Sequence, residues 1–322
     1  MRELEAWRTE IDAAAARLAG RVVRTELRRA DALSARAGAP VLLKLENRQT
    51  TGSFKLRGAT NAVALLDPAV LARGLVTAST GNHGRALAHA AAAAGARCTV
   101  FVSALVPPHK REGLSAAGAA IRILGRSQDE AEDAARAAAA AEGGHFVPPF
   151  DDPGVIAGQG TIGLEIMDAL PDAELVLVPL SGGGLAGGVA AAVKARRPAT
   201  RVIGVSMARG AAMQASLAAG HPVEVTEEPT LADALGGGIG RDNRYTFALA
   251  RELLDDVVLL SEQEIAAGIR AAFAEGEVVE GGGAVGIGAL LAGKADVRGP
   301  VAVILSGGNI DPELHRRILA EE

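Results

Sequence analysis

Thr51-Gly52-Ser53-Phe54-Lys55-Leu56-Arg57-Gly58 places a lysine among small residues, directly after an aromatic side chain. An apolar run at 41–45 predicts a strand before it, and apolar residues at helical spacing predict a helix after it. We therefore expect Lys55 in the first turn of a helix, where backbone N–H groups disfavour an ammonium. A neutral lysine amine is a nucleophile suited to Schiff-base chemistry, although a lone lysine is more often a solvated surface residue.

The amino-acid composition limits the classes of protein to which this chain can belong. Of the 322 residues, 49% are hydrophobic, enough for a sizeable core, and the net charge is −5. There is no basic stripe with interleaved aromatic residues, so no nucleic-acid partner is expected. No apolar run is long enough to span a bilayer, and the N-terminus lacks the apolar core of a signal peptide. With Cys98 as the one cysteine, these features predict a cytoplasmic protein.

Apolar runs that predict strands alternate with Ala-rich stretches that predict helices. The predicted strands cover residues 41–45, 75–78, 98–102, 120–123, 175–179, 201–205, 256–260 and 301–305. The predicted helices between them include residues 84–94, 129–141, 187–195 and 262–274. This alternation favours an α/β fold with mostly parallel, twisted sheets flanked by helices, in which ligands bind where strands end.

The stretch Ser79-Thr80-Gly81-Asn82-His83-Gly84 follows the strand predicted at 75–78 and opens a helix. Small polar residues at a helix N-terminus present N–H donors to an anion such as a carboxylate. The same residues are equally typical of plain helix capping. His83 is expected to contribute its backbone rather than act as a base. The histidines show no paired metal-ligand spacing, so no metal site is expected.

The stretch Ser181-Gly182-Gly183-Gly184-Leu185-Ala186-Gly187-Gly188 follows the strand predicted at 175–179 and also opens a helix. Glycines let the backbone approach a ligand closely and aim several N–H groups at a phosphate. The spacing also matches the G-x-G-x-x-G dinucleotide fingerprint. That fingerprint has an acidic residue after the next strand, where this chain has Ser206, so a single phosphate is favoured over NAD.

A fourth turn, Ser306-Gly307-Gly308-Asn309, places a hydroxyl at the end of the last predicted strand. Alone this is a common turn composition, but the four turns together resemble the site of one family. They resemble the fold-type II pyridoxal-phosphate enzymes of the threonine/serine dehydratase and serine racemase group. The resemblance covers nearly the whole chain and rests on residues 52–58, 79–83, 156–161, 181–185, 279–281 and 306–309. Residues 50–52, 79–85 and 235–240 look like the hydroxyectoine-utilisation dehydratase branch of that group.

The resemblance implies a cofactor, pyridoxal 5′-phosphate, held covalently by the amine of Lys55. The cofactor-binding residues would be Phe54, Lys55, Asn82, Gly182, Gly183, Gly184, Leu185, Glu280 and Ser306. Among these, Phe54 would lie against the ring, Asn82 would donate to the phenolic oxygen, and Ser306 would face the pyridine nitrogen. The loop at 182–185 would bind the phosphate through its N–H groups. The substrate carboxylate would be held by Ser79, Thr80, Gly81 and His83.

The activity implied is the dehydration and deamination of a β-hydroxy amino acid such as L-threonine or L-serine to a 2-oxo acid and ammonia. Lys55 would be the general base, with Thr80 as the second catalytic residue. A hydroxyl at Ser306 would leave the pyridine nitrogen largely unprotonated, which favours prompt loss of a β-leaving group. Racemases of the group carry a serine where this chain has Thr80, and Phe150 stands where relatives often have a polar or tyrosine side chain.

Other readings stay open. A serine/threonine racemase or a hydroxyectoine-pathway dehydratase would use the same cofactor, and the glycines at 236–238 suggest a pocket roomier than threonine needs. A catalytically silent paralogue that binds the cofactor is a third possibility, against which the intact set of Lys55, Asn82 and Ser306 argues. Several relatives bind a divalent cation through an acidic residue where Ser206 stands, so that cation is not expected here.

The resemblance also implies two domains in a fold like that of the tryptophan synthase β subunit. Residues 1–73 and 150–322 would form a large cofactor-binding domain, and residues 74–149 a small domain that closes over the substrate. The partner would be a small amino acid, with no membrane or nucleic acid involved, and the protein would be a homodimer or homotetramer.

Overall fold

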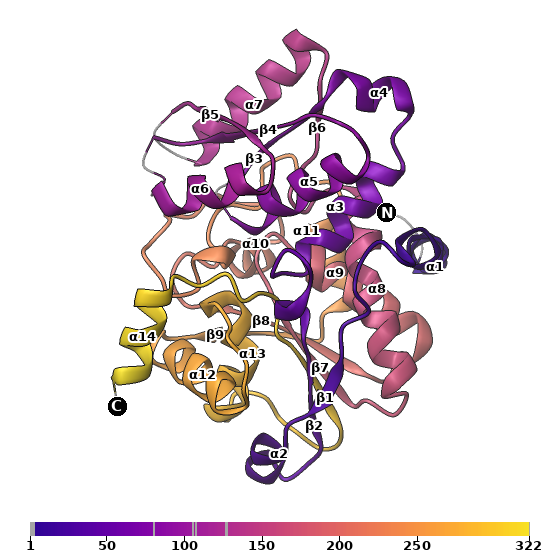
Figure 1. Ribbon diagram of the computed structural model, residues 1–322. Helices are drawn as coiled ribbons and strands as arrows, with labels where there is room; N and C mark the ends of the chain where they lie inside the picture. Colours follow the sequence, from indigo (N-terminus) through magenta and orange to yellow (C-terminus); the bar gives the residue numbers. More distant parts are fainter. Residues whose placement is uncertain (1–3, 80, 105, 107, 126–127, 322) are drawn as a thin grey trace.

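Two β-sheets organise the chain, the smaller one above the larger in Figure 1. The computed structural model describes residues 4–79, 81–104, 106, 108–125 and 128–321. The larger sheet has the strand order β1-β2-β10-β7-β8-β9, and the smaller sheet has the order β5-β4-β3-β6. Within these residues the strands pair in parallel, apart from β1 with β2.

The strands are β1 (Leu27–Arg29), β2 (Val41–Lys44), β3 (Leu75–Ala78), β4 (Cys98–Val102), β5 (Ala120–Ile123), β6 (His145–Phe146), β7 (Leu175–Pro179), β8 (Arg201–Met207), β9 (Asp256–Leu260) and β10 (Val301–Ile304). The α-helices are α1 (Leu4–Leu18), α2 (Asp31–Ala37), α3 (Lys55–Ala64), α4 (Pro68–Arg73), α5 (Asn82–Ala93), α6 (Pro108–Ala116), α7 (Gln128–Glu142), α8 (Pro153–Ala169), α9 (Gly184–Arg196), α10 (Ala212–Ala219), α11 (Thr246–Leu253), α12 (Glu262–Ala274), α13 (Gly281–Leu291) and α14 (Pro312–Ala320). Two 3₁₀ turns are η1 (Glu46–Arg48) and η2 (Asp233–Leu235). Among the described helices, none combines the length and the apolar character that a membrane span requires.

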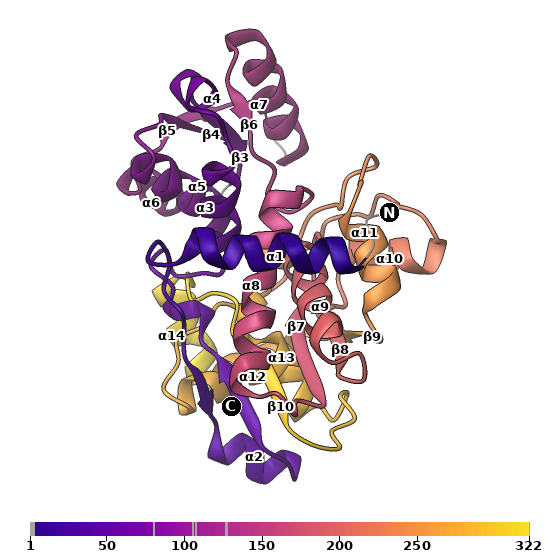
Figure 2. The same cartoon turned by 90° about the vertical axis from the view of Figure 1, so that its right-hand side faces the viewer.

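The centre of the larger sheet is buried on both faces because β7 and β10 are apolar throughout. In β7, Leu175 and Leu177 belong to the hydrophobic cluster under α12 and α13. The alternate residues Val176 and Val178 belong to the cluster under α8 and α9. Successive side chains of a strand point to opposite faces, so one apolar run serves two layers. Helix α1 lies across α8 and α9 as an outer layer (Figure 2).

The smaller sheet is covered by α7 on one face and by α5 and α6 on the other. Helix α3 contributes to the hydrophobic cluster on the α5 and α6 side of this sheet, because Leu56 and Val63 pack there with Leu87 and Val100. The same helix also packs against α8, which covers the larger sheet. The helix that begins at Lys55 therefore lies between the two sheets.

The eight predicted strands are confirmed, and the helix predicted at 262–274 has the predicted bounds. β1 and β6, with 3 and 2 residues, and the long helix α8 were not predicted. β8 continues to Met207, so Ser206 lies within the strand rather than after it. This corrects its predicted place at the strand end.

Candidate active site

The lysine turn lies against the turn that follows β10. Helix α3 begins at Lys55, as predicted. The Phe54 N–H donates to the Ser306 carbonyl at 2.9 Å, and the Gly308 N–H donates to the Gly52 carbonyl at 2.9 Å. These backbone hydrogen bonds bring Lys55 and Ser306 to one place, although they lie near opposite ends of the chain.

The amine of Lys55 is held against a carbonyl oxygen. Its Nζ donates to the Pro149 carbonyl at 2.7 Å and lies 5.3 Å from the centre of the Phe54 ring. Burial lowers the pKa of Lys55 from 10.5 to about 8, and the negative charge of Glu280 opposes that shift. The sequence predicted a disfavoured ammonium from the helix start, whereas in the structure the cause of the lowered pKa is removal of the amine from water.

Asn82 and Glu280 meet across two helix N-termini. Asn82 is the first residue of α5, and Glu280 directly precedes α13. The Asn82 Nδ2 donates to Glu280 Oε1 at 2.6 Å, and the Glu280 N–H donates to the Gly307 carbonyl at 3.1 Å. Because Gly307 follows Ser306, three of the predicted cofactor residues come together here.

Ser306 is buried at the end of β10, where its hydroxyl donates to the Gly282 carbonyl at 3.4 Å. The group available to a ligand at this strand end is thus a neutral hydroxyl rather than a carboxylate. Across the part of the chain that the structure describes, no group of three His, Cys, Asp or Glu side chains is arranged to hold a metal ion.

The turn before α5 carries the predicted carboxylate ligands. The Ser79 hydroxyl accepts from the Gly81 N–H at 3.4 Å, and Thr80 lies outside the described residues. His83 is buried, with its Nε2 3.1 Å from the Val147 carbonyl. Burial and the nearby lysine amine lower the pKa of His83 to about 3. A neutral imidazole offers no cation to a carboxylate, so a carboxylate bound at this turn would depend on backbone N–H groups.

The glycine loop connects β7 to α9. Gly183 has φ of 88°, in the left-handed region, and a Cβ there would lie 2.7 Å from the Met213 Cε. A Cβ on Gly182 would overlap the ring of Phe150. Leu185 is buried in the first turn of α9. The loop therefore requires glycine both for its backbone conformation and for its close packing.

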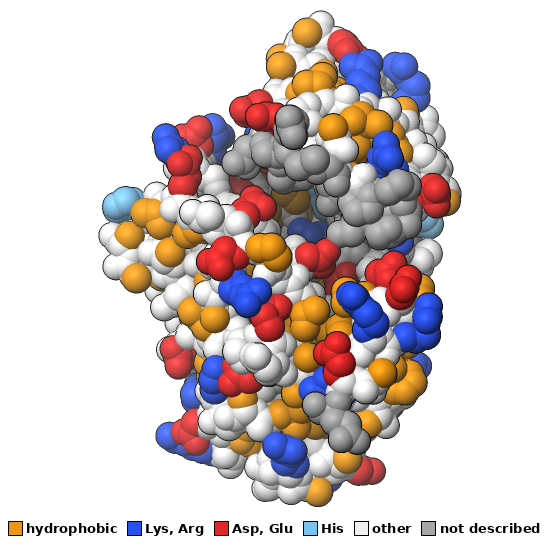
Figure 3. Space-filling view, turned by 90° about the vertical axis from the view of Figure 1, so that its left-hand side faces the viewer, with side chains coloured by type: hydrophobic (Ala, Val, Ile, Leu, Met, Phe, Trp, Pro, Cys, Tyr) orange, Lys and Arg blue, Asp and Glu red, His pale blue; other side chains and the backbone are white. Residues whose placement is uncertain are grey.

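This arrangement fits pyridoxal phosphate. Without side chains, the loop leaves its N–H groups open to a phosphate, and the 13-residue helix α9 directs its positive end toward that place. Phe150 packs on the loop, and the carbonyl of the neighbouring Pro149 accepts a hydrogen bond from the Lys55 amine. The glycine loop and the Lys55 amine thus lie beside the same short segment. One face of the molecule is hollowed between its upper and lower parts, with basic side chains inside the hollow (Figure 3).

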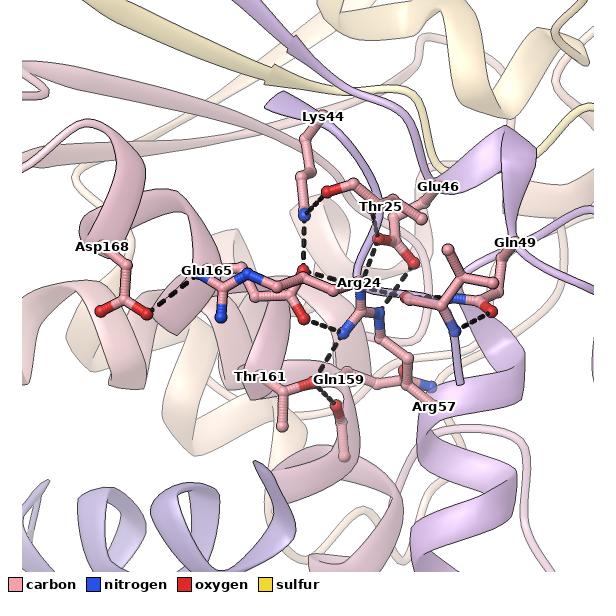
Figure 4. A network of polar contacts seen from close by, with 12 residues as sticks. Arg24, Thr25, Lys44, Glu46, Gln49, Arg57, Gln159, Thr161, Glu165 and Asp168 are labelled. Atoms are coloured by element: carbon pink, nitrogen blue, oxygen red, sulfur yellow. Dashed lines mark hydrogen bonds and ion pairs between the residues drawn. The ribbon is translucent and has the colours of Figure 1, made fainter. Parts of the chain in front are cut away.

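Two residues after Lys55, at Arg57, α3 joins a buried ion network that the sequence did not predict (Figure 4). The Arg57 guanidinium donates to Glu46 Oε1 at 2.8 Å and to Glu165 Oε1 at 2.7 Å. Lys44 donates to Glu165 Oε2 at 2.5 Å, and the Thr25 hydroxyl donates to Glu46. The network joins α3 to β2, η1, α8 and the segment before β1.

The network balances two positive and two negative side chains. Arg57 and Glu46 are 1% and 0% exposed. Burial opposes the charge on Glu165, but hydrogen bonds and charge from Arg57 and Lys44 lower its pKa below the ordinary value of 4.5. A buried charge is tolerated when it is paired and hydrogen-bonded. The charges inside two apolar runs, at Lys44 and Glu165, were the signal that could have revealed it.

The comparisons with known proteins agree on one family. The sequence model of the family described as pyridoxal-phosphate dependent enzyme matches residues 18–307. A putative threonine dehydratase of Sinorhizobium fredii is 57% identical over 96% of this chain and 94% of its own length. The L-threonine ammonia-lyase of Geobacter sulfurreducens is 43% identical over 94% of this chain and 75% of its own. The structure of maize serine racemase superimposes with a TM-score of 0.91 at 30% identity, covering 97% of this chain and 96% of that one.

The family match spans most of the chain, and the two relatives named above, both well above 30% identity, align over 94% and 75% of their own lengths. The predicted α/β fold and the predicted cofactor, pyridoxal phosphate, are confirmed. The chain belongs to the fold-type II pyridoxal-phosphate dependent enzymes, in the group that contains threonine dehydratases and serine racemases.

Proposed function

We propose that the protein is a threonine ammonia-lyase, which converts L-threonine or L-serine to a 2-oxo acid and ammonia. The observation that carries the proposal is the amine of Lys55, whose pKa is lowered to about 8 by burial. The 57% identity to a putative threonine dehydratase and the 43% identity to an L-threonine ammonia-lyase support the substrate class.

Each residue of the proposed site has its own role in this reaction. Lys55 holds the cofactor and then, as a free amine, takes the α-proton of the substrate. When bound, the cofactor supplies an electron sink for the carbon that loses this proton. N–H groups at the start of α5 hold the substrate carboxylate, and the glycine loop holds the phosphate. Ser306 would offer the ring nitrogen of the cofactor a neutral hydroxyl rather than a carboxylate, which would leave that nitrogen largely unprotonated. Lys55 would return the proton it has taken to the departing β-hydroxyl.

A second candidate acts on the same cofactor. A Cβ added at Gly236, Gly237 or Gly238 would meet no atom closer than 3.3 Å, so this loop leaves room beside it. That room favours a substrate larger than threonine, such as the one used by a hydroxyectoine-utilisation dehydratase. The similarity to the structure of maize serine racemase, with a TM-score of 0.91, supports racemase activity as an alternative.

We also propose the domain division that the sequence suggests, with residues 74–149 closing over the substrate from the large domain of 1–73 and 150–322. The separate sheet of β3 to β6 supports this division. The protein would act in the cytoplasm as a homodimer or homotetramer.

A turnover assay tests the proposed function. The purified protein is incubated with each enantiomer of serine and threonine, and 2-oxo acid release and enantiomer exchange are measured together. Rapid 2-oxo acid release from the L-enantiomers supports the lyase. Faster exchange of enantiomers would replace it with a racemase, and neither activity, with the cofactor bound, would indicate a silent paralogue.

Uptake of pyridoxal phosphate by the cofactor-free protein should depend on pH around the pKa of Lys55. Only the neutral amine attacks the aldehyde, so the uptake rate should rise about tenfold per pH unit below pH 8 and level off above it. With an ordinary lysine the rise would continue to about pH 10.5. The measurement is stopped-flow absorbance across pH 6–10, and a rate still rising above pH 9 would contradict a pKa near 8.

Gly183→Asp should abolish tight cofactor binding. The new side chain meets Met213, forces a strained backbone at a φ of 88°, and places a carboxylate in the phosphate loop. We expect the affinity for pyridoxal phosphate to fall by about a hundredfold or more. Gly220→Asp is the matched control, since Gly220 has φ of 79° but lies at the end of α10, with nothing near its Cβ position. Equal affinities for the two variants would place the phosphate elsewhere.

A further inference from the structure

A chain of hydrogen bonds runs from the helix that bears Asn82 through the turn after β10 and back. Arg85 Nη1 donates to Asn309 Oδ1 at 3.2 Å. Asn309 Nδ2 donates to the Thr51 carbonyl at 3.0 Å and to Asn82 Oδ1 at 2.6 Å. Asn82 Nδ2 in turn donates to Glu280 Oε1 at 2.6 Å. We call the hydrogen-bonded side chains Arg85, Asn309, Asn82 and Glu280 the relay. Every donor in the relay faces an acceptor.

The two ends of the relay fix the direction of everything between them. A guanidinium can only donate, and a carboxylate can only accept. Arg85 therefore holds the oxygen of the Asn309 amide toward itself. The Thr51 carbonyl, which can only accept, holds the Asn309 nitrogen on the other side, where it also meets Asn82. Asn82 must then present its oxygen to Asn309 and its nitrogen to Glu280. An asparagine amide has nearly the same shape when turned over, so such neighbours alone decide which end points where.

We propose that Arg85 and Asn309 are positioning residues that hold the Asn82 amide with its nitrogen toward the cofactor. The Asn82 nitrogen has two N–H bonds. Glu280 takes one, and the second is available to the phenolic oxygen of pyridoxal phosphate. With the amide turned over, its oxygen would meet the carboxylate and that cofactor oxygen, both of which are acceptors. This inference rests on the proposed role of Asn82 in the cofactor site.

The packing around the relay supports a dedicated arrangement. A Cβ on Gly52 would lie 2.6 Å from the Asn309 Oδ1, so glycine at this position leaves the space that the Asn309 amide occupies. A Cβ on Gly113 of α6 would overlap the Arg85 guanidinium, which thus lies directly on that helix. Arg85 therefore joins the small sheet's helices to the turn after β10.

The test is a double-mutant cycle on cofactor affinity. Arg85→Met keeps the length of the side chain and removes its donors, whereas Arg85→Lys keeps a cation that only donates. We expect Arg85→Met to weaken pyridoxal phosphate binding about tenfold, equivalent to ~1.4 kcal/mol, and Arg85→Lys to retain most of the affinity. In an Asn82→Ala background, Arg85→Met should have less than a twofold further effect, because the amide it orients is gone.

A second variant and a control separate positioning from general structure. Asn309→Asp keeps the size of the side chain but cannot donate to Asn82, so it should also weaken cofactor binding about tenfold. Arg73→Met makes the same replacement at an arginine whose Nε donates to the Gly143 carbonyl, away from the relay, and should leave the affinity unchanged.

The outcomes are distinguishable. Equal losses from Arg85→Met in the two backgrounds, or no loss in the unmodified background, would overturn the relay while the cofactor site stands. An unmodified protein that binds no pyridoxal phosphate would overturn the proposed function, and the relay with it. The visible absorption of each cofactor-loaded variant, titrated with pH, gives an independent readout. The bound cofactor's pKa should shift in Arg85→Met and in Asn309→Asp and stay unchanged in Arg73→Met.

Discussion

Replacing Lys55 with alanine is expected to abolish 2-oxo acid release, lowering turnover by at least about a thousandfold. The variant loses both the covalent attachment of the cofactor and the general base, and a positioned base alone contributes about a hundredfold to ten-thousandfold. Borohydride treatment should fix the cofactor to the unmodified protein and leave the Lys55→Ala variant unlabelled. Peptide mapping by mass spectrometry locates the adduct.

The control uses another lysine. Lys194 lies in the last turn of α9, at the end of the helix away from the glycine loop, and pairs with Asp255. Lys194→Ala should therefore keep both the label and the turnover. An adduct found on Lys44, Lys110, Lys194 or Lys294 in the unmodified protein would contradict the assignment of Lys55 as the reactive amine.

Replacing Arg57 with methionine is expected to destabilise the fold by about 3–5 kcal/mol. Methionine fills a similar space but leaves two buried carboxylates, Glu46 and Glu165, without their shared cation. Removing one partner from a buried charge network leaves the remaining charges without compensation in the protein interior, which solvates them poorly. The midpoint of unfolding in guanidinium chloride, followed by circular dichroism on cofactor-free protein, measures the effect.

The matched control is Arg24→Met. Arg24 pairs with Asp168 beside the network (Figure 4), but the two side chains are 64% and 43% exposed. An exposed pair contributes about 0–1 kcal/mol, so the control should unfold close to the unmodified protein. If the two arginine variants unfolded at the same denaturant concentration, the buried network would not be what stabilises α3.

The sequence predicted those parts of the fold that are encoded locally. β7 and β10 were found because each is a short apolar run followed by glycine or serine, which marks a buried parallel strand. β1 and β6 are too short to show a period. α8 was missed because it is buried on nearly all sides and rich in glycine, so it has no polar stripe to reveal a helical period.

The candidate site also has parts that local sequence predicts and parts that depend on distant contacts. Lys55 and Gly183 stand in local motifs, each at the junction of a strand and a helix, and their placement could be predicted. The relay from Arg85 through Asn309 could not, because its direction depends on contacts between segments far apart in the chain. The fully neutral His83 also follows from burial by distant segments, which no local pattern encodes.

The place of β10 has a consequence for how the protein is made. This strand follows β2 and β7 in the sequence, yet it lies between them, pairing Val301 with both Val41 and Leu175. During synthesis β2 and β7 leave the ribosome long before β10, so the centre of the larger sheet stays open until β10 has emerged. The smaller sheet has only local partners and can form earlier. Because Ser306 arrives with β10, a nascent chain can expose Lys55 before the residues around it are in place, and the proposed site is complete only after β10 inserts.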